Sequence, residues 1–434
     1  MPKISPLAPT SFPTIPPIDG VRFASGVANI RYKDRVDLFY AELVEGTTVA
    51  GVFARSSMPS AAVDWCRHAM VDGDGHARAL VVNSGNANAF TGRQGAEAAR
   101  GTAEAAARIA GTRSGEVFVS STGVIGEPLP YERIVAKLPD LKTALGTAKG
   151  DEWEAAARAI STTDTFPKGA VRTASIGGVP VTIAGICKGS GMIAPNMGTM
   201  LGYVFTDAQI SSGLLQHLLT RAADKSFNAI TVDSDASTND TVLAFATGRA
   251  KHPWVAAAGD AHFRDFRRKF DEVMLELAHQ IVKDGEGATK FVTVTVTGAA
   301  GAASAKRHSV LYLFYDRGSV KTPDTEIFSS DSKDCAASPN SVQCCTVLEG
   351  SVMSTMFRKG AEEARNQLPD LLEAAEHGRS TIITRHGRPV AALVPVEGYA
   401  VRQQPLIPLA GSGRGLWGKN STEVLRKLRD EWSR

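Results

Sequence analysis

Up to about residue 300, apolar positions change their spacing from run to run, which predicts a mixture of strands and helices. Several short β-rich runs fill residues 21–54, and compact apolar or alternating runs bounded by turn residues follow. We predict buried strands in these later runs, at 79–82, 117–120 and 179–184 and at the alternating Val292, Val294 and Val296. A Pro-rich arm, residues 1–20, precedes them and should be extended and poorly packed.

Other segments repeat apolar residues at helical spacing, at 95–110, 151–161, 211–227 and 263–282. The last two have clear apolar faces, formed by Leu214, Leu218 and Ala222 and by Phe266, Phe270, Val273 and Leu277. Layers of helices on mixed sheets bury such faces economically, so we expect an α/β fold.

The pattern breaks at Lys188-Gly-Ser-Gly-Met-Ile-Ala-Pro-Asn-Met-Gly198-Thr199, before an apolar run that begins at Met200. The two glycines around Ser190 and the Pro-Asn pair favour a turn-rich loop, so Thr199 lies where a loop enters a buried strand. A threonine hydroxyl at this position can act as a nucleophile. If the Gly198-Thr199 bond were cut, the new α-amine, which titrates near pH 7.7–8.0, would supply a general base. The alternative is an ordinary glycine-rich turn without a function.

Composition excludes several classes of protein. The chain has 434 residues, 43% of them hydrophobic, and a net charge of +3, which gives no sign of nucleic-acid or membrane binding. The five cysteines form no disulfide framework, and Cys66 and Cys187 should pack as small buried residues. No apolar run approaches the length of a membrane span, so we expect a cytoplasmic protein.

Several long motifs occur in one particular order: Val82-Asn-Ser-Gly-Asn-Ala-Asn-Ala-Phe-Thr-Gly92, Ser120-Ser-Thr-Gly-Val-Ile-Gly126, Thr163-Asp-Thr-Phe-Pro-Lys168 and Asp284-Gly-Glu-Gly-Ala-Thr-Lys290. In this the chain resembles the glutamate N-acetyltransferase / ornithine acetyltransferase family of arginine biosynthesis. The resemblance runs from about Ile18 to about Ala300. The C-terminal third of the family, with an asparagine and a small hydroxyl residue that hold the substrate, has no counterpart.

The resemblance implies a self-processing enzyme with a threonine nucleophile. Thr199 would attack the carbonyl of Gly198, where the family usually has alanine, and the chain would split into two parts that form an α/β heterotetramer. The hydroxyl of Thr199 would then take acetyl from N-acetylornithine, or from acetyl-CoA in bifunctional members, and pass it to glutamate. No cofactor is implied, since acetyl-CoA would be a substrate.

The resemblance also assigns site residues. Thr122 and Gly123 would form the oxyanion hole, for which the Ser121-Thr122-Gly123 turn can supply a hydroxyl and a backbone N–H. Substrate contacts would come from Thr162, Lys188, Glu286 and Thr199, with Lys188 at the mouth of the loop for a carboxylate and Glu286 for an ammonium group.

A cluster of acidic and amide residues, Asp233, Asp235, Asn239 and Asp240, has some features of a calcium loop. The glycine at the sixth position and the closing glutamate are missing, so we predict no metal site. In the related family this stretch is a structural and substrate-side loop.

A second resemblance begins after residues 301–352, whose composition suits a disordered linker or an out-of-frame segment. From Met353 a helical stripe over 361–375 and strands at 381–384 and 390–394 are expected. With Ile383-Thr-Arg-His-Gly-Arg-Pro-Val-Ala-Ala-Leu-Val-Pro395, this order resembles the DNA-binding half of prevent-host-death type antitoxins.

The antitoxin resemblance implies operator DNA and a toxin as partners. The tail should form an amphipathic helix after Ser421, with Val424, Leu428 and Trp432 on one face that docks on a toxin. The alternative is an ordinary helical tail.

We therefore expect the following division of the chain: 1–20 arm, 21–198 and 199–300 acetyltransferase α and β parts, 301–352 linker or aberrant segment, 353–400 antitoxin-like DNA-binding and dimerisation domain, and 401–434 toxin-binding-like tail. Three functions are open: an acetyltransferase with an appended antitoxin-like domain, a non-catalytic remnant fused to a working antitoxin, or a self-processing amidohydrolase or peptidase.

Overall fold

The structure is a computed structural model that describes residues 3–194, 200–233, 237–255 and 257–296, together with five later strands. Contacts divide the chain into two compact units, Met1–Ser351 and Val352–Arg434. Gly198, Thr199 and Asp235 lie outside the described residues.

The first unit contains a four-stranded sheet in the order β1-β2-β4-β5. Its strands are β1 (Val21–Gly26), β2 (Leu38–Leu43), β4 (Ala79–Asn86) and β5 (Val117–Val124). β2 pairs antiparallel with both β1 and β4, whereas β4 and β5 run parallel. The ends of β4 and β5 therefore meet at one edge, where the Asn83 and Thr122 motifs lie.

A five-stranded sheet lies against the first one, in the order β3-β9-β8-β7-β6. Its strands are β3 (Thr48–Phe53), β6 (Lys168–Ile176), β7 (Val179–Lys188), β8 (Leu201–Thr206) and β9 (Thr241–Ala246). β8 and β9 are parallel, and the other neighbours are antiparallel. The residues between β7 and β8 thus connect two paired strands of one sheet.

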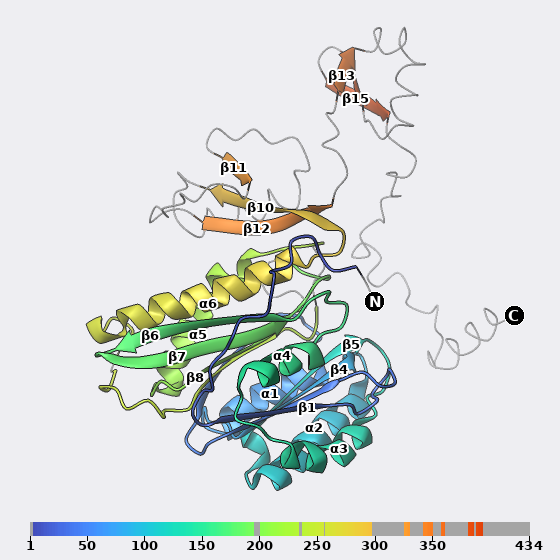
Figure 1. The fold of residues 1–434 in the computed structure, drawn as a ribbon. Coiled ribbons are helices and arrows are strands. Elements are labelled where there is room, and N and C mark those ends of the chain that lie inside the picture. The colour runs from blue at the N-terminus through green and yellow to red at the C-terminus, as the bar shows by residue number, and fades with distance from the viewer. Residues whose placement is uncertain are drawn as a thin grey trace, which may run out of the picture. The chain divides into compact units, whose positions relative to one another are not determined.

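Helices pack on the two sheets (Figure 1). They are α1 (Ala61–Asp72), α2 (Gly92–Ala110), α3 (Tyr131–Thr143), α4 (Gly150–Ala159), α5 (Ser212–Lys225) and α6 (Arg264–Lys283), with short 3-10 turns at Ser114–Glu116, Phe227–Ala229 and Ala261–Phe263. One of these helices, α4, contacts strands of both sheets. α5 and α6 pack on the five-stranded sheet, and α2 and α3 pack on the four-stranded one. The expected α/β layering is confirmed. Within the described part of the chain, no helix combines the length and apolar character needed to cross a bilayer.

Aromatic side chains from both sheets fill the space between them. The rings of Phe205 and Phe245 stack with centroids 5.1 Å apart, and Phe23 meets Trp153 of α4 edge to face at 4.7 Å. All of these side chains are buried. This packing stabilises the contact between the two sheets. Each aromatic pair contributes about 0.5–1.5 kcal/mol beyond the effect of burying its apolar area.

Several expectations need correction. The Pro-rich arm is well packed, since Ile15 and Ile18 are each 1% exposed within the core and Ser5 Oγ donates a hydrogen bond of 2.6 Å to the Lys283 carbonyl. Two strands, β11 (Thr325–Ser329) and β12 (Val342–Glu349), lie in the range expected to be a linker. Both pair antiparallel with β10 (Ala288–Val296).

The second unit contains β13 (Phe357–Gly360), β14 (Thr381–Arg385) and β15 (Arg388–Leu393) in one sheet. β13 runs parallel to β14, and β14 and β15 form an antiparallel pair. The two later strands were expected, whereas β13 was not. The predicted helices over 361–375 and after Ser421 lie outside the described residues.

Candidate functional site

Thr122 lies near the end of β5, where the four-stranded sheet contacts Lys188 of the five-stranded sheet. It stands opposite Ser84 in the parallel pairing of β4 and β5 and is 4% exposed. The next residue, Gly123, has φ +131°, and a Cβ there would lie 2.3 Å from the carbonyl carbon of Gly85. Only glycine fits this close approach, so the turn after Thr122 depends on a residue without a side chain.

Lys188 ends β7 and brings its ammonium group to Thr122. Its Nζ donates a hydrogen bond of 3.0 Å to Thr122 Oγ1, although the residue is only 3% exposed. An ammonium group can only donate, so Thr122 accepts this bond and its own hydroxyl proton is left to bond elsewhere. Burial lowers the pKa of Lys188, and the carboxylates of Asp164 and Asp240 oppose that effect.

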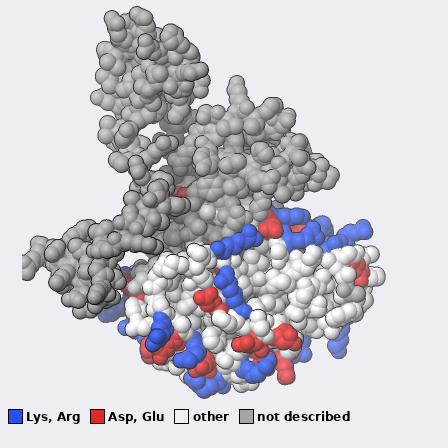
Figure 2. All heavy atoms as spheres, turned by 180° about the vertical axis from the view of Figure 1, so that it is seen from behind, with Lys and Arg blue, Asp and Glu red and all other residues white. Residues whose placement is uncertain are grey.

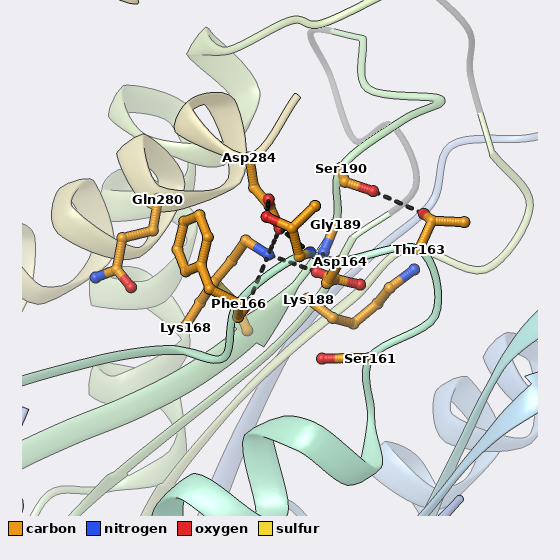
Figure 3. Close-up of polar contacts among 12 residues, drawn as sticks. Ser161, Thr163, Asp164, Phe166, Lys168, Lys188, Gly189, Ser190, Gln280 and Asp284 are labelled. Atoms are coloured by element: carbon orange, nitrogen blue, oxygen red, sulfur yellow. Dashed lines mark hydrogen bonds and ion pairs between the residues drawn. The ribbon is translucent and has the colours of Figure 1, made fainter. Parts of the chain in front are cut away.

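A buried ion triad lies next to Lys188 (Figure 3). The ammonium of Lys168 lies 2.6 Å from Asp164 Oδ1 and 2.5 Å from Asp284 Oδ2, and all three side chains are at most 1% exposed. The ring of Phe166 covers the same ammonium, with its centroid 4.7 Å away. Burial alone would lower the pKa of Lys168, but the two carboxylates outweigh it and raise the pKa above its ordinary value.

Asp164 connects this triad to the loop that follows β7. Its Oδ1 accepts a hydrogen bond of 2.7 Å from the Gly189 N–H, and its Oδ2 accepts one of 3.0 Å from the Thr162 N–H. Burial would raise the pKa of Asp164, but the ammonium groups of Lys168 and Lys188 hold it well below its usual range. Asp164 is therefore an anion that fixes both Gly189 and the backbone of Thr162.

Ser190 extends the cluster towards the end of α6. The hydroxyls of Ser190 and Thr163 are 2.7 Å apart, and the Ser190 carbonyl accepts a hydrogen bond of 3.2 Å from the Glu286 N–H. Glu286 itself is exposed. The start of the loop after β7 is thus held from two sides, by the residues before β6 and by those after α6.

Asp240 holds the other end of that loop. Its Oδ1 accepts a hydrogen bond of 2.8 Å from the N–H of Met200, the residue just before β8. Asp240 is 0% exposed, and its Oδ2 has no hydrogen-bond partner among the described residues. Burial raises the pKa of Asp240 to about 7, although the Met200 N–H and the charge of Lys188 lower it.

Comparison with known proteins identifies the family. The sequence pattern of the ArgJ family matches residues 22–312. The chain belongs to the ArgJ family. The "Arginine biosynthesis bifunctional protein ArgJ" of Ruegeria pomeroyi is 54% identical over 308 residues, which are 71% of this chain and 73% of that protein. The protein of the same name from Mesorhizobium japonicum is 53% identical over 307 residues, 70% of this chain and 73% of the relative.

The second unit matches a different family. The pattern described as "Antitoxin Phd_YefM, type II toxin-antitoxin system" covers residues 356–412. Both resemblances expected from the motifs are therefore confirmed. Arginine biosynthesis is the pathway of the ArgJ family, and the chain joins an ArgJ domain to an antitoxin domain.

Solved structures of the ArgJ family are also similar to this chain. An ArgJ from Bacillus halodurans is 29% identical and covers 42% of this chain and 92% of its own, with a TM-score of 0.38. Ornithine acetyltransferase from Mycobacterium tuberculosis, solved with ornithine, is 31% identical and covers 42% and 93%, with a TM-score of 0.35.

The structure brings together most of the site residues expected from the ArgJ resemblance. Thr122, Gly123 and Lys188 lie at the meeting point of the two sheets, and Thr162 and Glu286 reach the same cluster through their backbone N–H groups. Lys188 was expected at the mouth of the loop, and it ends β7 there, buried against Thr122. The assigned roles stay predictions.

The stretch that has some features of a calcium loop, residues 233–240, forms hydrogen bonds to other segments of the chain. The carboxylate of Asp233 accepts the N–H of Ile193 at 2.9 Å, and Asn239 Nδ2 donates to the carbonyls of Ala87 and Ser121 at 2.5 and 2.8 Å. Within the described residues, no group of three or more His, Cys, Asp or Glu side chains is arranged to hold a metal ion.

Sequence reasoning missed the charged residues that organise the site. Asp164, Lys168 and Asp284 all lie in the motifs that identify the family, but none was selected as a site residue. A usable signal was the acidic residue close to Lys168 within the same motif, since a lysine that is buried requires an acidic partner. Asp164, placed four residues earlier, was the nearest such partner.

A groove of about 460 Å³ lies elsewhere in the ArgJ domain, between α5 and α6. Basic side chains line it, namely Arg221, Lys225, Arg264, Arg267 and Arg268. Seen from behind, basic side chains gather along one edge of the described surface (Figure 2). None of the predicted site residues lines this groove, so it is separate from the cluster around Thr122 and Lys188.

Proposed function

We propose that the ArgJ domain transfers an acetyl group from N-acetylornithine to glutamate through an ester on Thr199. The observation that carries this proposal is the hydrogen bond between Lys188 and Thr122. It directs the free proton of the Thr122 hydroxyl away from Lys188, as a donor to an oxyanion requires. Lys188 also pairs with Leu201 in the ladder of β7 with β8, and Leu201 follows Thr199 by two residues in the sequence.

The chemistry begins with self-cleavage. Thr199 attacks the Gly198 carbonyl, and hydrolysis of the resulting ester leaves Thr199 with a free α-amine. This amine then serves as the base that activates the threonine hydroxyl. In the first half of the transfer, the hydroxyl takes acetyl and ornithine leaves; in the second half, the amine of glutamate removes the acetyl group.

Substrate binding is proposed for Thr162, Lys188, Glu286 and Thr199. Glu286 is exposed beside Ser190 and suits an ammonium group, and Lys188 suits a carboxylate or the oxyanion donor itself. Acetyl-CoA would serve as a second acetyl donor and not as a bound cofactor. After cleavage, the two fragments would form an α/β heterotetramer.

Mass spectrometry tests the acetyl-enzyme. Purified protein incubated with N-acetylornithine alone should carry one acetyl group on the peptide that begins at Thr199, and added glutamate should remove it. Thr199→Ala protein should carry none. Wild-type protein that cleaves but never acquires the acetyl group would refute the transfer and leave the self-processing hydrolase as the better proposal.

A second function is proposed for the antitoxin domain, because residues 356–412 match that family independently of the ArgJ domain. Residues 353–434 would dimerise, bind operator DNA through basic residues such as Arg358, Lys359 and Arg365, and cover a toxin with the face that contains Trp432. Growth rescue against a co-encoded toxin tests this function, and Trp432→Ala should abolish rescue without preventing dimerisation. If acetyl transfer is absent while rescue is present, the ArgJ domain is a non-catalytic remnant.

A further inference from the structure

The groove between α5 and α6 has a surplus of positive charge. The C-terminal half of α5 and the N-terminal half of α6 line it. Its two carboxylates belong to Asp271 and Glu272, and its five basic side chains belong to Arg221, Lys225, Arg264, Arg267 and Arg268. The surplus is therefore three positive charges. Like charges that share one groove repel one another, so an anion that joins them would be bound favourably.

The ion pairs inside the groove reduce this surplus very little. The guanidinium of Arg268 lies 2.6 Å from Asp265 Oδ1 and 2.9 Å from Glu272 Oε1. Glu272 also pairs with Lys269, which does not line the groove, at 3.1 Å. Among the described residues, no ion pair forms at the other four basic side chains, which we call the unpaired basic residues: Arg221, Lys225, Arg264 and Arg267.

Asp271 cannot neutralise these four residues. Burial raises the pKa of its carboxyl group, and the charges of Lys225, Arg221 and Arg267 oppose that rise. A carboxylate has a single negative charge, so three cations share one countercharge. The groove therefore keeps cations that the described carboxylates do not balance.

Arg267 also has a buried donor without an acceptor. Its Nε is shielded from solvent and has no hydrogen-bond partner among the described residues. A guanidinium stays protonated in proteins and can only donate. Because buried polar atoms nearly always have a partner, this N–H indicates an acceptor that the described residues do not supply.

The size and apolar lining of the groove favour a small ligand. Its volume of about 460 Å³ lies within the range of about 300–1,000 Å³ that is typical of small-molecule sites. Leu218 and Ala222 are buried along it, and Leu275 is 36% exposed. A small ligand can place anionic groups on the basic residues and an uncharged part on Leu275. A DNA duplex, whose charges repeat along its whole length, has no use for such an apolar lining.

Phosphate is the anionic group that suits this groove best. Four of the five basic side chains are arginines, and a guanidinium can donate two parallel hydrogen bonds to phosphate oxygens. A carboxylate brings a single negative charge, whereas a phosphate group brings roughly 1.5–2 near pH 7. Two phosphate groups therefore match the surplus of three charges better than one carboxylate or one phosphate does.

We propose that the groove between α5 and α6 binds an organic diphosphate, such as a nucleoside diphosphate. The unpaired basic residues hold the phosphate oxygens, and the Nε–H of Arg267 donates to one of them. The uncharged part of the ligand rests on Leu275. This site is separate from the cluster around Thr122 and Lys188, so binding there does not depend on acetyl transfer.

Isothermal titration calorimetry of the purified full-length chain tests this site, with ADP as the probe. ADP should bind, and its affinity should fall as salt is added, because salt screens the charges. Inorganic pyrophosphate should bind more weakly than ADP, since it lacks the part that rests on Leu275. Inorganic phosphate should bind more weakly still, and adenosine, which has no phosphate, should not bind.

Arg267→Gln should weaken ADP binding at least about 10-fold, because it removes a charge and a charge-assisted hydrogen bond. Arg158→Gln is the matched control. Arg158 is an exposed arginine of α4 that pairs with Glu154 at 2.5 Å and does not line the groove, so this variant loses the same charge but should bind ADP like the wild type. Near-ultraviolet circular dichroism checks that each variant keeps its fold. If Arg267→Gln does not fold, the exposed Arg264 provides the deciding variant, Arg264→Gln.

Several outcomes would overturn the proposal. Folded wild-type protein that does not bind ADP excludes the site. Equal affinity of the wild type and the folded groove variant places the ligand elsewhere, and so does displacement of ADP by N-acetylornithine. If pyrophosphate or adenosine binds as tightly as ADP, the ligand is not an organic diphosphate. A short DNA duplex whose binding depends on Arg267, in a protein that does not bind ADP, would identify a nucleic-acid surface instead.

Discussion

The hydrogen-bond partners of two buried lysines of the ArgJ domain determine the role of each. Lys168 and Lys188 are both buried lysines, but Lys168 lies between two carboxylates whereas Lys188 donates to a neutral hydroxyl. Their pKa values are accordingly shifted in opposite directions. The first lysine is a structural cation, and the second is the one whose charge can act on the site around Thr122.

At Gly123, adding one methyl group should destabilise the protein. Gly123→Ala would place a Cβ 2.3 Å from the Gly85 carbonyl carbon at a φ of +131°, so both a steric clash and backbone strain arise. The strain alone costs about 1–3 kcal/mol, and the clash adds to it. Gly126→Ala is the control, because φ is +82° there but no atom lies within 4 Å. Urea denaturation should show a clearly larger loss for Gly123→Ala; equal losses would contradict the close approach of β4 and β5.

The carboxyl group of Asp240 should also make stability depend on pH. Burial raises its pKa from 3.8 in the unfolded chain to about 7 in the folded one. Between these two pH values the unfolded chain has lost the proton that the folded chain retains. The free energy of unfolding therefore falls as the pH rises from about 4 to about 7, by roughly 1.4 kcal/mol for each pH increment of one. Asp240→Asn removes this contribution and should gain stability relative to the wild type across that range. Denaturation at a series of pH values measures the free energy of unfolding of both proteins. If the two free energies change with pH in the same way, the prediction is wrong.

Among the elements, those with a simple apolar period were predictable. α6 has Phe266, Phe270, Val273 and Leu277 buried on one stripe, as expected from spacing alone. α3 was missed because Pro139, which normally breaks a helix, lies inside it, although Ile134, Leu138 and Leu141 are buried at helical spacing. Element prediction therefore fails where a residue with the wrong propensity is tolerated by tertiary packing.

The site could be predicted only as separate motifs. Thr122 and Lys188 end strands of different sheets, and nothing local in the sequence says that β5 and β7 bring them within 3.0 Å of each other. The family resemblance selected both residues without explaining their contact. Asp240 was noticed only as part of a calcium-like stretch, because its value depends on burial and on a contact with Met200, which spacing does not reveal.

The buried triad should be a major contributor to the attachment of α6. Lys168→Met leaves Asp164 and Asp284 buried without their cation, and breaking a buried pair in this way costs about 3–5 kcal/mol. Lys269→Met is the matched control, since Lys269 forms a partly exposed pair with Glu272 at 3.1 Å that is worth roughly 0–1 kcal/mol. Guanidinium denaturation of the two variants measures both losses. Similar small losses would mean that the triad is not closed in solution.

At the scale of the whole molecule, the ArgJ domain is built so that the proposed cleavage site separates strands that pair with each other. β3, β6 and β7 precede Thr199, and β8 and β9 follow it, but the five form one sheet in the order β3-β9-β8-β7-β6. A strand that precedes Thr199 therefore pairs with a strand that follows it at two places, β3 with β9 and β7 with β8. The antitoxin domain, beyond Ser351, would stay covalently joined to the second fragment.

This topology predicts that the cleaved protein remains a single particle. Separating residues 1–198 from 199–434 would break the ladders of β7 with β8 and of β3 with β9, and would expose the aromatic core that Phe23 and Trp153 share with Phe205 and Phe245. Burying such side chains contributes about 1.5–3 kcal/mol each. Their sum should hold the two fragments together after the peptide bond between them is cut. Wild-type protein should therefore elute from a sizing column at the same volume as uncleaved Thr199→Ala, and show two bands only on a denaturing gel. Fragments that elute separately without denaturant would refute the shared sheet.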